Sequence, residues 1–302
     1  MRIVKLTTET TKNLLDELLQ RSPNSYGEYE SRVNEIIENV RSRRDEAVFA
    51  YTKQFDGADI DAGNILVTED EIRSAYEQVD PSLLEVMRKS LANIRSFHEK
   101  QLQQSWFASQ DNGILLGQKV MPLHTAGVYV PGGKAVYPSS VLMNIVPAKV
   151  AGVRRIIMTT PPDAQGKICP STLVAAKEAG ADEIYKAGGA QAVAAMAFGT
   201  QSIPRVDKIV GPGNIYVALA KKAVFGFVSI DSIAGPSEIL VLADETADPV
   251  YAAADLLSQA EHDEMASAIL ITTSMELAEQ VSAQTDRFLQ TLSRREIIQK
   301  SL

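Results

Sequence analysis

The chain has 302 residues, of which 45% are hydrophobic and 23% are charged, with a formal net charge of -8. A chain of this length and composition can bury one large core or two ordinary ones, so we expect a globular protein. The acidic balance, with an isoelectric point near 5.1, argues against a nucleic-acid binder, which normally presents a basic face. Small molecules are therefore the expected partners.

The cysteine count and the hydropathy of the chain restrict its expected cellular location. Cys169 is the single cysteine, which excludes an intramolecular disulfide framework and a cysteine-rich metal site and fits a reducing, cytoplasmic location. Near a helix start its thiol could be a nucleophile, although a lone cysteine is more often a small buried hydrophobe. No apolar run reaches membrane length without a charge or a Gly-Pro break. We expect neither export nor membrane insertion.

The first part of the chain, residues 8 to about 103, is predicted to be mainly helical. Apolar residues at helical spacing predict a long helix over Val33–Tyr51 that ends before Gly57. A capping box at Thr68–Glu71 and the pair Asp80-Pro81 mark the starts of two further helices. We expect these helices to pack in the core of the protein.

The second part of the chain is predicted to contain strands. Residues 106–121 indicate a hairpin with an Asn-Gly turn. From about residue 126 strands alternate with helices, which is typical of a doubly wound parallel sheet. Its expected strands are 127–130, 155–159, 183–186, 208–210 and 228–230. A further run has strands at 238–243 and 266–272, which are too few for a complete sheet. Either strands from before residue 126 complete this sheet, or the chain ends before its domain does.

Four turns at the ends of predicted strands contain clustered glycine, at residues 130–134, 187–191, 210–214 and 234–238. In an open α/β sheet the carboxyl ends of the strands line the ligand crevice, and glycine lets backbone amides approach an anionic group. A nucleotide is the expected guest. Structural turns also use glycine and proline, and neither a Gly-x-Gly-x-x-Gly fingerprint nor a Walker loop is present.

The stretch Asp255–Glu264 gathers most of the side chains that could bind a metal. Gln259 and His262 are three residues apart at the end of a predicted helix, so they should project from nearly the same face. A plainer interpretation is a polar C-terminal turn in which His262 faces the helix dipole and Gln259 is solvated. Local sequence leaves both interpretations open.

Five motifs, read together, resemble the histidinol dehydrogenase family along essentially the whole chain. They are 127–144 (GVYVPGGKAVYPSSVLMN), 188–192 (GGAQA), 206–214 (VDKIVGPGN), 234–238 (AGPSE) and 255–262 (DLLSQAEH). The resemblance implies an α/β fold of two doubly wound Rossmann-like domains, the second nested within the first, with a helical N-terminal part. The implied divisions are an N-terminal arm at 1–24, a first domain at 25–127 plus 237–302, and an inserted NAD domain at 128–236. The first domain is expected to be incomplete because the chain ends early.

The resemblance also names a reaction. It implies a zinc-dependent homodimer that oxidises L-histidinol through histidinaldehyde to L-histidine with two NAD, the last step of histidine biosynthesis. The family's NAD contacts fall on Tyr129, Gln191 and Asn214. Its substrate contacts fall on Ser237, Gln259 and His262, of which the last two are also zinc ligands.

The family's remaining zinc ligands and its catalytic Glu-His pair fall beyond Leu302 by the same resemblance. No catalytic residue is therefore expected in this chain, and a zinc site with two ligands missing should bind metal weakly. The leading hypothesis is a C-terminally truncated, inactive histidinol dehydrogenase whose homodimer is weakened. Two alternatives stay open, a relative that oxidises another small alcohol, such as a sulfonated diol, and a non-catalytic binding or assembly module.

Overall fold

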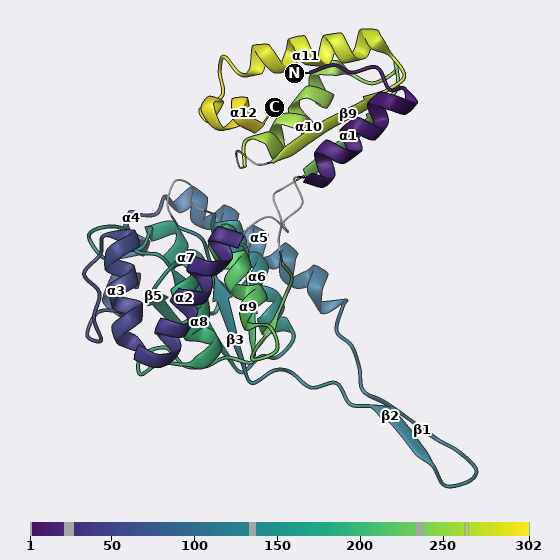
Figure 1. Ribbon diagram of the computed structural model, residues 1–302. Helices are drawn as coiled ribbons and strands as arrows, with labels where there is room; N and C mark the ends of the chain where they lie inside the picture. The colour runs from purple at the N-terminus through teal and green to yellow at the C-terminus, as the bar shows by residue number, and fades with distance from the viewer. Residues whose placement is uncertain are drawn as a thin grey trace. The chain divides into compact units, whose positions relative to one another are not determined.

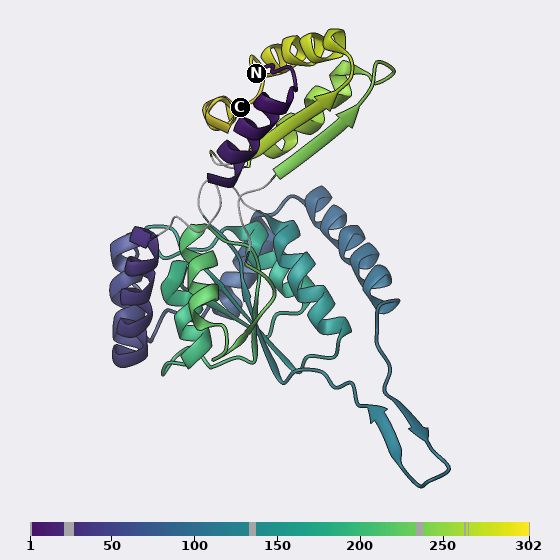
Figure 2. The same cartoon turned by 45° about the vertical axis from the view of Figure 1, so that its right-hand side comes forward.

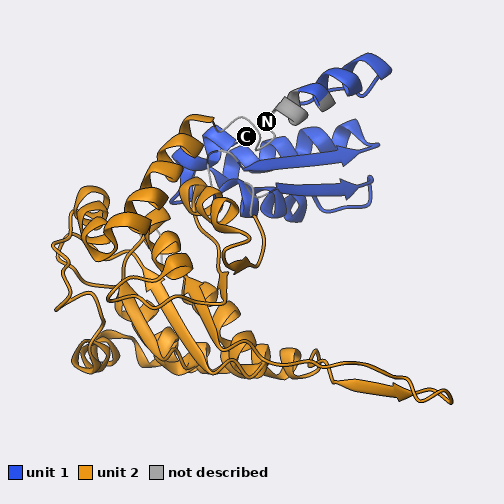
Figure 3. Ribbon diagram, turned by 60° about the horizontal axis from the view of Figure 1, so that its bottom comes forward, with its two compact units in different colours: residues 1–25, 235–302 blue, residues 26–234 orange. Residues whose placement is uncertain are grey.

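The computed structural model describes residues 2–20, 27–132, 137–233, 238–262, 264 and 266–301, without the side chains of 15 and 17–20. The chain divides into two compact units, Met1–Ser25 with Gly235–Leu302, and Tyr26–Ala234 (Figure 3). This division places residues 26–127 in the same unit as the central sheet. The nested domain boundaries implied by the resemblance stay a prediction.

The larger unit is built on a five-stranded parallel sheet with the order β5-β4-β3-β6-β7 (Figure 1). The strands are β3 (Thr125–Tyr129), β4 (Arg155–Thr160), β5 (Glu183–Lys186), β6 (Lys208–Val210) and β7 (Ser229–Ile230). The chain builds outward from β3 to β5, then crosses back to β6, so the switch point lies between β3 and β6. The predicted doubly wound sheet is confirmed for this unit, with each strand within two residues of its expected start.

Helices cover both faces of this sheet (Figure 2). One core contains α4 (Glu69–Gln78), α5 (Pro81–Glu99), α6 (Pro138–Val150) and α7 (Pro170–Ala179). The other contains α2 (Gly27–Arg43), α3 (Asp45–Asp56), α8 (Gly189–Phe198) and α9 (Ile215–Val224). Val128 belongs to the first core and Tyr129 to the second, because successive side chains of a strand point to opposite faces.

The prediction of one long helix that reaches Tyr51 is wrong in one respect, because the helix is broken at Arg44 into α2 and α3. Arg44 has a φ of 55°, a left-handed conformation that costs energy in a non-glycine residue. Its guanidinium donates to the carbonyl oxygens of Phe198 at 3.0 Å and Gly199 at 2.6 Å. These charge-assisted bonds at the end of α8 offset the strain.

Both predicted helix starts are confirmed. The Thr68 hydroxyl accepts from the Glu71 backbone N–H at 3.2 Å, and the Glu71 carboxylate accepts from the Thr68 N–H at 2.9 Å. Asp80 caps α5 by accepting from the Ser82 N–H at 2.7 Å. Each cap satisfies N–H groups that have no partner within the helix, and α4 and α5 are thereby fixed in register over the first core.

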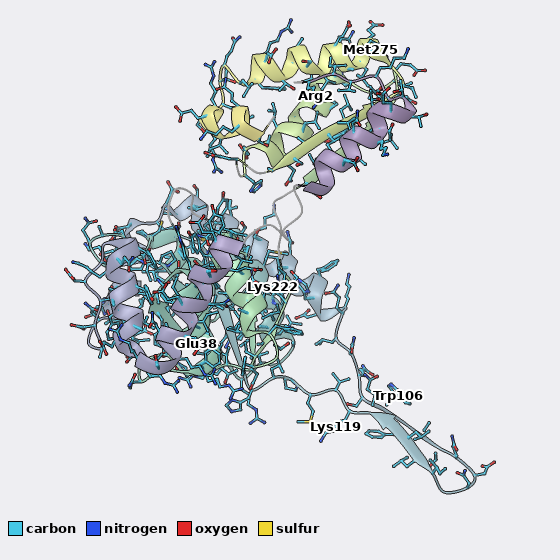
Figure 4. All side chains as sticks on the ribbon, viewed as in Figure 1. Arg2, Glu38, Trp106, Lys119, Lys222 and Met275 are labelled. Carbon is cyan, nitrogen blue, oxygen red and sulfur yellow. The ribbon has the colours of Figure 1, made fainter. Side chains whose placement is uncertain are left out.

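The predicted hairpin is also confirmed, as β1 (Trp106–Ser109) paired antiparallel with β2 (Leu115–Gln118). Gly113 in its turn has a φ of 82°, the conformation that favours glycine. Every residue of both strands is exposed, and the hairpin extends away from the sheet of the larger unit, with Trp106 and Lys119 labelled on it in Figure 4.

The smaller unit contains a two-stranded parallel sheet of β8 (Glu238–Ala243) and β9 (Ser267–Thr272). Its helices are α1 (Thr8–Gln20), α10 (Pro249–Ala260), α11 (Met275–Phe288) and α12 (Arg295–Ser301). Leu256 of α10 and Val281 of α11 are fully buried in its core. Within the described part of this unit only two strands occur, as the strand count predicted. Over the described residues of the chain, no helix has the length and apolarity needed to cross a membrane.

Candidate functional site

Tyr129, the last residue of β3, lies at the switch point of the sheet and is 3% exposed. Its hydroxyl oxygen accepts a hydrogen bond from the backbone N–H of Gly189 at 3.1 Å. Burial raises the pKa of Tyr129 to about 12, so the hydroxyl keeps its proton at neutral pH. The side chain thereby joins the end of β3 to the first turn of α8.

Gln191 lies in that first turn of α8 and is 1% exposed. Its Oε1 is buried and accepts no hydrogen bond from the described residues. Gly189, with a φ of 59°, lies so close that a Cβ there would stand 2.7 Å from this oxygen. A buried acceptor without a donor costs about 1–3 kcal/mol, so this oxygen is suited to a hydrogen-bond donor that a ligand supplies.

Asn214 is the N-cap of α9, where its Oδ1 accepts from the Val217 N–H at 3.2 Å. Because Oδ1 of Asn214 is occupied by this capping bond, the side-chain NH₂ group remains available as a donor. Gly211, earlier in the same turn, has a φ of 116°. A Cβ on it would stand 2.0 Å from the carbonyl oxygen of Tyr129. Only glycine fits at this position, and the turn is held against the end of β3.

An ion pair between a buried lysine and an exposed aspartate holds this turn in place. Lys221 of α9 is 3% exposed, pairs with Asp231 after β7, and donates to the Gly211 carbonyl oxygen at 3.0 Å. Asp231 Oδ2 accepts from the Gly211 N–H at 2.8 Å. Sequence reasoning missed this pair because, at the level of sequence, Lys221 and its neighbour Lys222 both suit a solvated helix face. Only the fold brings α9 and the segment after β7 together.

Asp56, at the end of α3, is a second residue that sequence reasoning missed. Its Oδ2 is buried and accepts no hydrogen bond within the described part of the chain. Burial raises the pKa of Asp56 to about 6, and its charge contributes to the raised pKa of Tyr129. A carboxyl with a perturbed pKa therefore acts electrostatically on a residue at the switch point.

Gln259 and His262 lie at the end of α10 in the smaller unit, half-buried and exposed, respectively. The His262 backbone N–H donates to the Gln259 carbonyl oxygen at 3.0 Å. The described residues hold no group of three or more His, Cys, Asp or Glu that could bind a metal ion, and Ser237 lies outside them. The residues that the structure describes do not complete a tetrahedral zinc site.

A further expectation concerns the single cysteine. Cys169 is exposed, and the expectation of a small buried hydrophobe is wrong. It precedes Pro170, the first residue of α7, and its thiol lies 3.4 Å from the Ser171 hydroxyl. The thiol lies at the surface because the buried residues of α7 begin only at Thr172 and Leu173.

A doubly wound parallel sheet with glycine turns after β3, β5 and β6 defines the class of α/β proteins that bind a ligand, typically a nucleotide, at the carboxyl ends of their strands. The family model of histidinol dehydrogenase matches residues 19–302. The chain therefore belongs to the histidinol dehydrogenase family.

Individual relatives agree with this assignment. The chain is 56% identical over 299 residues to a histidinol dehydrogenase of Bacillus thuringiensis subsp. konkukian (strain 97-27), covering 99% of this chain and 66% of that protein. It is 58% identical over 275 residues to that of Bacillus subtilis (strain 168), covering 91% and 64%. The crystal structure of histidinol dehydrogenase from Elizabethkingia anophelis is similar with a TM-score of 0.90 at 39% identity, covering 99% and 68%. This chain spans about two thirds of the length of these relatives.

Proposed function

We propose that this chain carries the NAD-binding part, and part of the substrate site, of a histidinol dehydrogenase. The reaction is the oxidation of L-histidinol through histidinaldehyde to L-histidine, with two NAD reduced in succession. The observation that carries the NAD assignment is the buried Oε1 of Gln191, which accepts no hydrogen bond from the described residues. It lies in the helix turn whose Gly189 N–H donates to the hydroxyl of Tyr129. A nucleotide that brings a donor to the first turn of α8 would satisfy that oxygen.

Tyr129, Gln191 and Asn214 take separate parts in holding the nucleotide. When bound, NAD accepts the hydride. The protonated hydroxyl of Tyr129 offers a donor, the Gln191 oxygen accepts, and the Asn214 NH₂ donates. Because these groups sit on a strand end and two helix starts that are packed into one core, they are preorganised for binding.

Gln259 and His262 would supply two donors to zinc, and Ser237 a contact to the substrate. An imidazole is a common zinc ligand, while a glutamine oxygen is a weaker one. The described residues supply only part of a tetrahedral set of ligands. Residues 1–302 by themselves are proposed to bind zinc weakly and to form the family's homodimer less tightly.

The family's Glu-His acid-base pair has no counterpart in the motifs of residues 1–302. We therefore expect residues 1–302 alone to bind NAD and to oxidise histidinol at a negligible rate. Isothermal titration calorimetry with NAD and a steady-state NADH assay with L-histidinol and zinc test this. Absence of NAD binding refutes the proposed nucleotide role, and turnover equal to that of a full-length relative refutes the proposed incompleteness.

A further inference from the structure

Asp56, the last residue of α3, carries a half-buried carboxyl group that is not among the proposed nucleotide contacts. Its Oδ2 is buried and accepts no hydrogen bond from the described residues. Burial raises its pKa to about 6, so the group is ionised at pH 8. Lys53, on the same helix, pairs with Asp59 at 2.6 Å instead. Over the described residues, Asp56 therefore holds a negative charge that no cation pairs with.

The helices α3 and α8 pack against each other and run in opposite directions. At one end of the pair, the Arg44 guanidinium, just before α3, donates to the Phe198 carbonyl oxygen at the end of α8 at 3.0 Å. From there Asp56 lies about 18 Å along α3 and Gly189 about 14 Å along α8, at about 1.5 Å per residue. The carboxyl group of Asp56 therefore comes within about one helical turn of the level of Gly189, at the start of α8.

The other end of this helix pair lies at the carboxyl ends of the strands. A Cβ on Gly57, the residue after Asp56, would stand 3.7 Å from the Cβ of Ala164, in the segment after β4. The Tyr129 hydroxyl accepts from the Gly189 N–H at 3.1 Å, and the charge of Asp56 contributes to the raised pKa of that hydroxyl. These observations place the negative charge of Asp56 within electrostatic reach of a proposed nucleotide contact.

Oxidised and reduced NAD differ by one charge. The nicotinamide ring is positive in NAD and neutral in NADH, whereas the diphosphate carries the same charge in both forms. A carboxylate that no cation pairs with attracts the positive ring but not the neutral one, and burial strengthens this attraction because less water screens it. Across about 12 Å, at an effective dielectric constant of about 20, one unit charge changes an affinity about tenfold.

We propose that Asp56 makes this chain bind oxidised NAD more tightly than NADH. The inference rests on the proposed NAD binding and adds a residue that distinguishes the two oxidation states. The proposed reaction reduces two NAD in succession, so the first NADH has to leave before the second NAD enters. A carboxylate that lowers the affinity for NADH shortens its residence time and favours this exchange.

The ratio of two dissociation constants, the Kd of NADH divided by the Kd of NAD, tests the role of Asp56. Isothermal titration calorimetry at pH 8 measures both constants for the unmodified chain and for Asp56→Asn. We expect NAD to bind more tightly than NADH to the unmodified chain, and the ratio to fall about tenfold in the variant. A purely structural effect of the substitution changes both constants by the same factor and leaves the ratio unchanged. Because asparagine has the shape of aspartate and removes a charge that burial disfavours, the variant should fold.

Asp56→Glu and Asp59→Asn are the matched controls. Asp56→Glu keeps a carboxylate at the end of α3 and should keep most of the ratio. Asp59→Asn removes a nearby carboxylate whose side chain is 86% exposed and pairs with Lys53. Because solvent screens the charge of Asp59, this variant should leave the ratio unchanged.

The same titrations separate this inference from the proposed function. If NAD binds and the ratio is the same in Asp56→Asn as in the unmodified chain, the role of Asp56 is overturned and the proposed function stands. A fall of the same size in Asp59→Asn also overturns it, because the overall charge of the chain then accounts for the effect. If neither nucleotide binds, both are overturned.

Discussion

The backbone of Gly211 lies against the carbonyl oxygen of Tyr129 so closely that no side chain can stand between them; a Cβ would be 2.0 Å away. This contact joins the turn after β6 to the end of β3 at the switch point of the sheet. It therefore sets the distance between the turn that presents Asn214 and the strand that presents Tyr129.

Gly211→Ala is expected to destabilise the fold by about 2–4 kcal/mol, because it adds a clash with backbone to the strain of a φ of 116°. Gly226→Ala is the control, since Gly226 has a φ of 101° but nothing within 4 Å of its Cβ position. It should lose only the strain, about 1–2 kcal/mol. Urea unfolding of both variants measures the difference, and equal losses contradict the importance of the contact.

Lys221→Met should destabilise the protein by about 1–3 kcal/mol, because it removes the cation that pairs with Asp231 and the donor to the Gly211 carbonyl oxygen. Lys222→Met, one residue along the same helix, removes an exposed pair with Glu30 and should change stability little. The double variant Lys221→Met with Asp231→Asn should recover part of the loss. Thermal unfolding of the set checks this, and a Lys221→Met variant as stable as Lys222→Met rules out the proposed role of the pair.

Gln191→Met should have opposite effects on stability and on binding. Without nucleotide the variant is expected to be as stable as the unmodified chain or about 1 kcal/mol more stable, because it removes a buried acceptor that has no donor. Its affinity for NAD should fall about tenfold, the loss of one hydrogen bond. Thermal unfolding and calorimetry measure the two effects. If the variant is destabilised yet binds NAD normally, Gln191 has a structural role only.

The raised pKa of Asp56 predicts that the stability of the protein depends on pH. Its pKa in the folded protein is about 6, above its ordinary value of 3.8, so the folded state binds the proton more tightly than the unfolded state. This contribution favours folding below pH 4, is lost as the pH rises to about 6, and is absent above it. The stability difference between the unmodified protein and Asp56→Asn should change between pH 4 and 6 and stay flat above 7. A constant difference across that range contradicts the assignment to Asp56.

Local patterns predicted those features whose partners are near in sequence. The capping box of Thr68 and Glu71 and the turn at Gly113 depend on residues within four positions, and the buried strands follow from their apolar runs. The break at Arg44 could not be predicted, because its partners, Phe198 and Gly199, are more than 150 positions away.

The candidate site was predictable only in part. Tyr129, Gln191 and Asn214 came from a family resemblance, and the structure adds the physical features that make them suitable, a buried acceptor and a capped amide. Lys221 with Asp231, and Asp56 with the first turn of α8, lie on segments that only the fold brings together. The roles of Ser237, Gln259 and His262 stay predictions.

The central claim is that residues 1–302 form an NAD site at the switch point of the larger unit. Isothermal titration of the chain with NAD tests it most directly, with Gln191→Met titrated in parallel. We expect saturable binding of one NAD per chain, with an affinity that falls about tenfold in the variant. No saturable heat from the unmodified chain, or equal affinity in the two proteins, would contradict it.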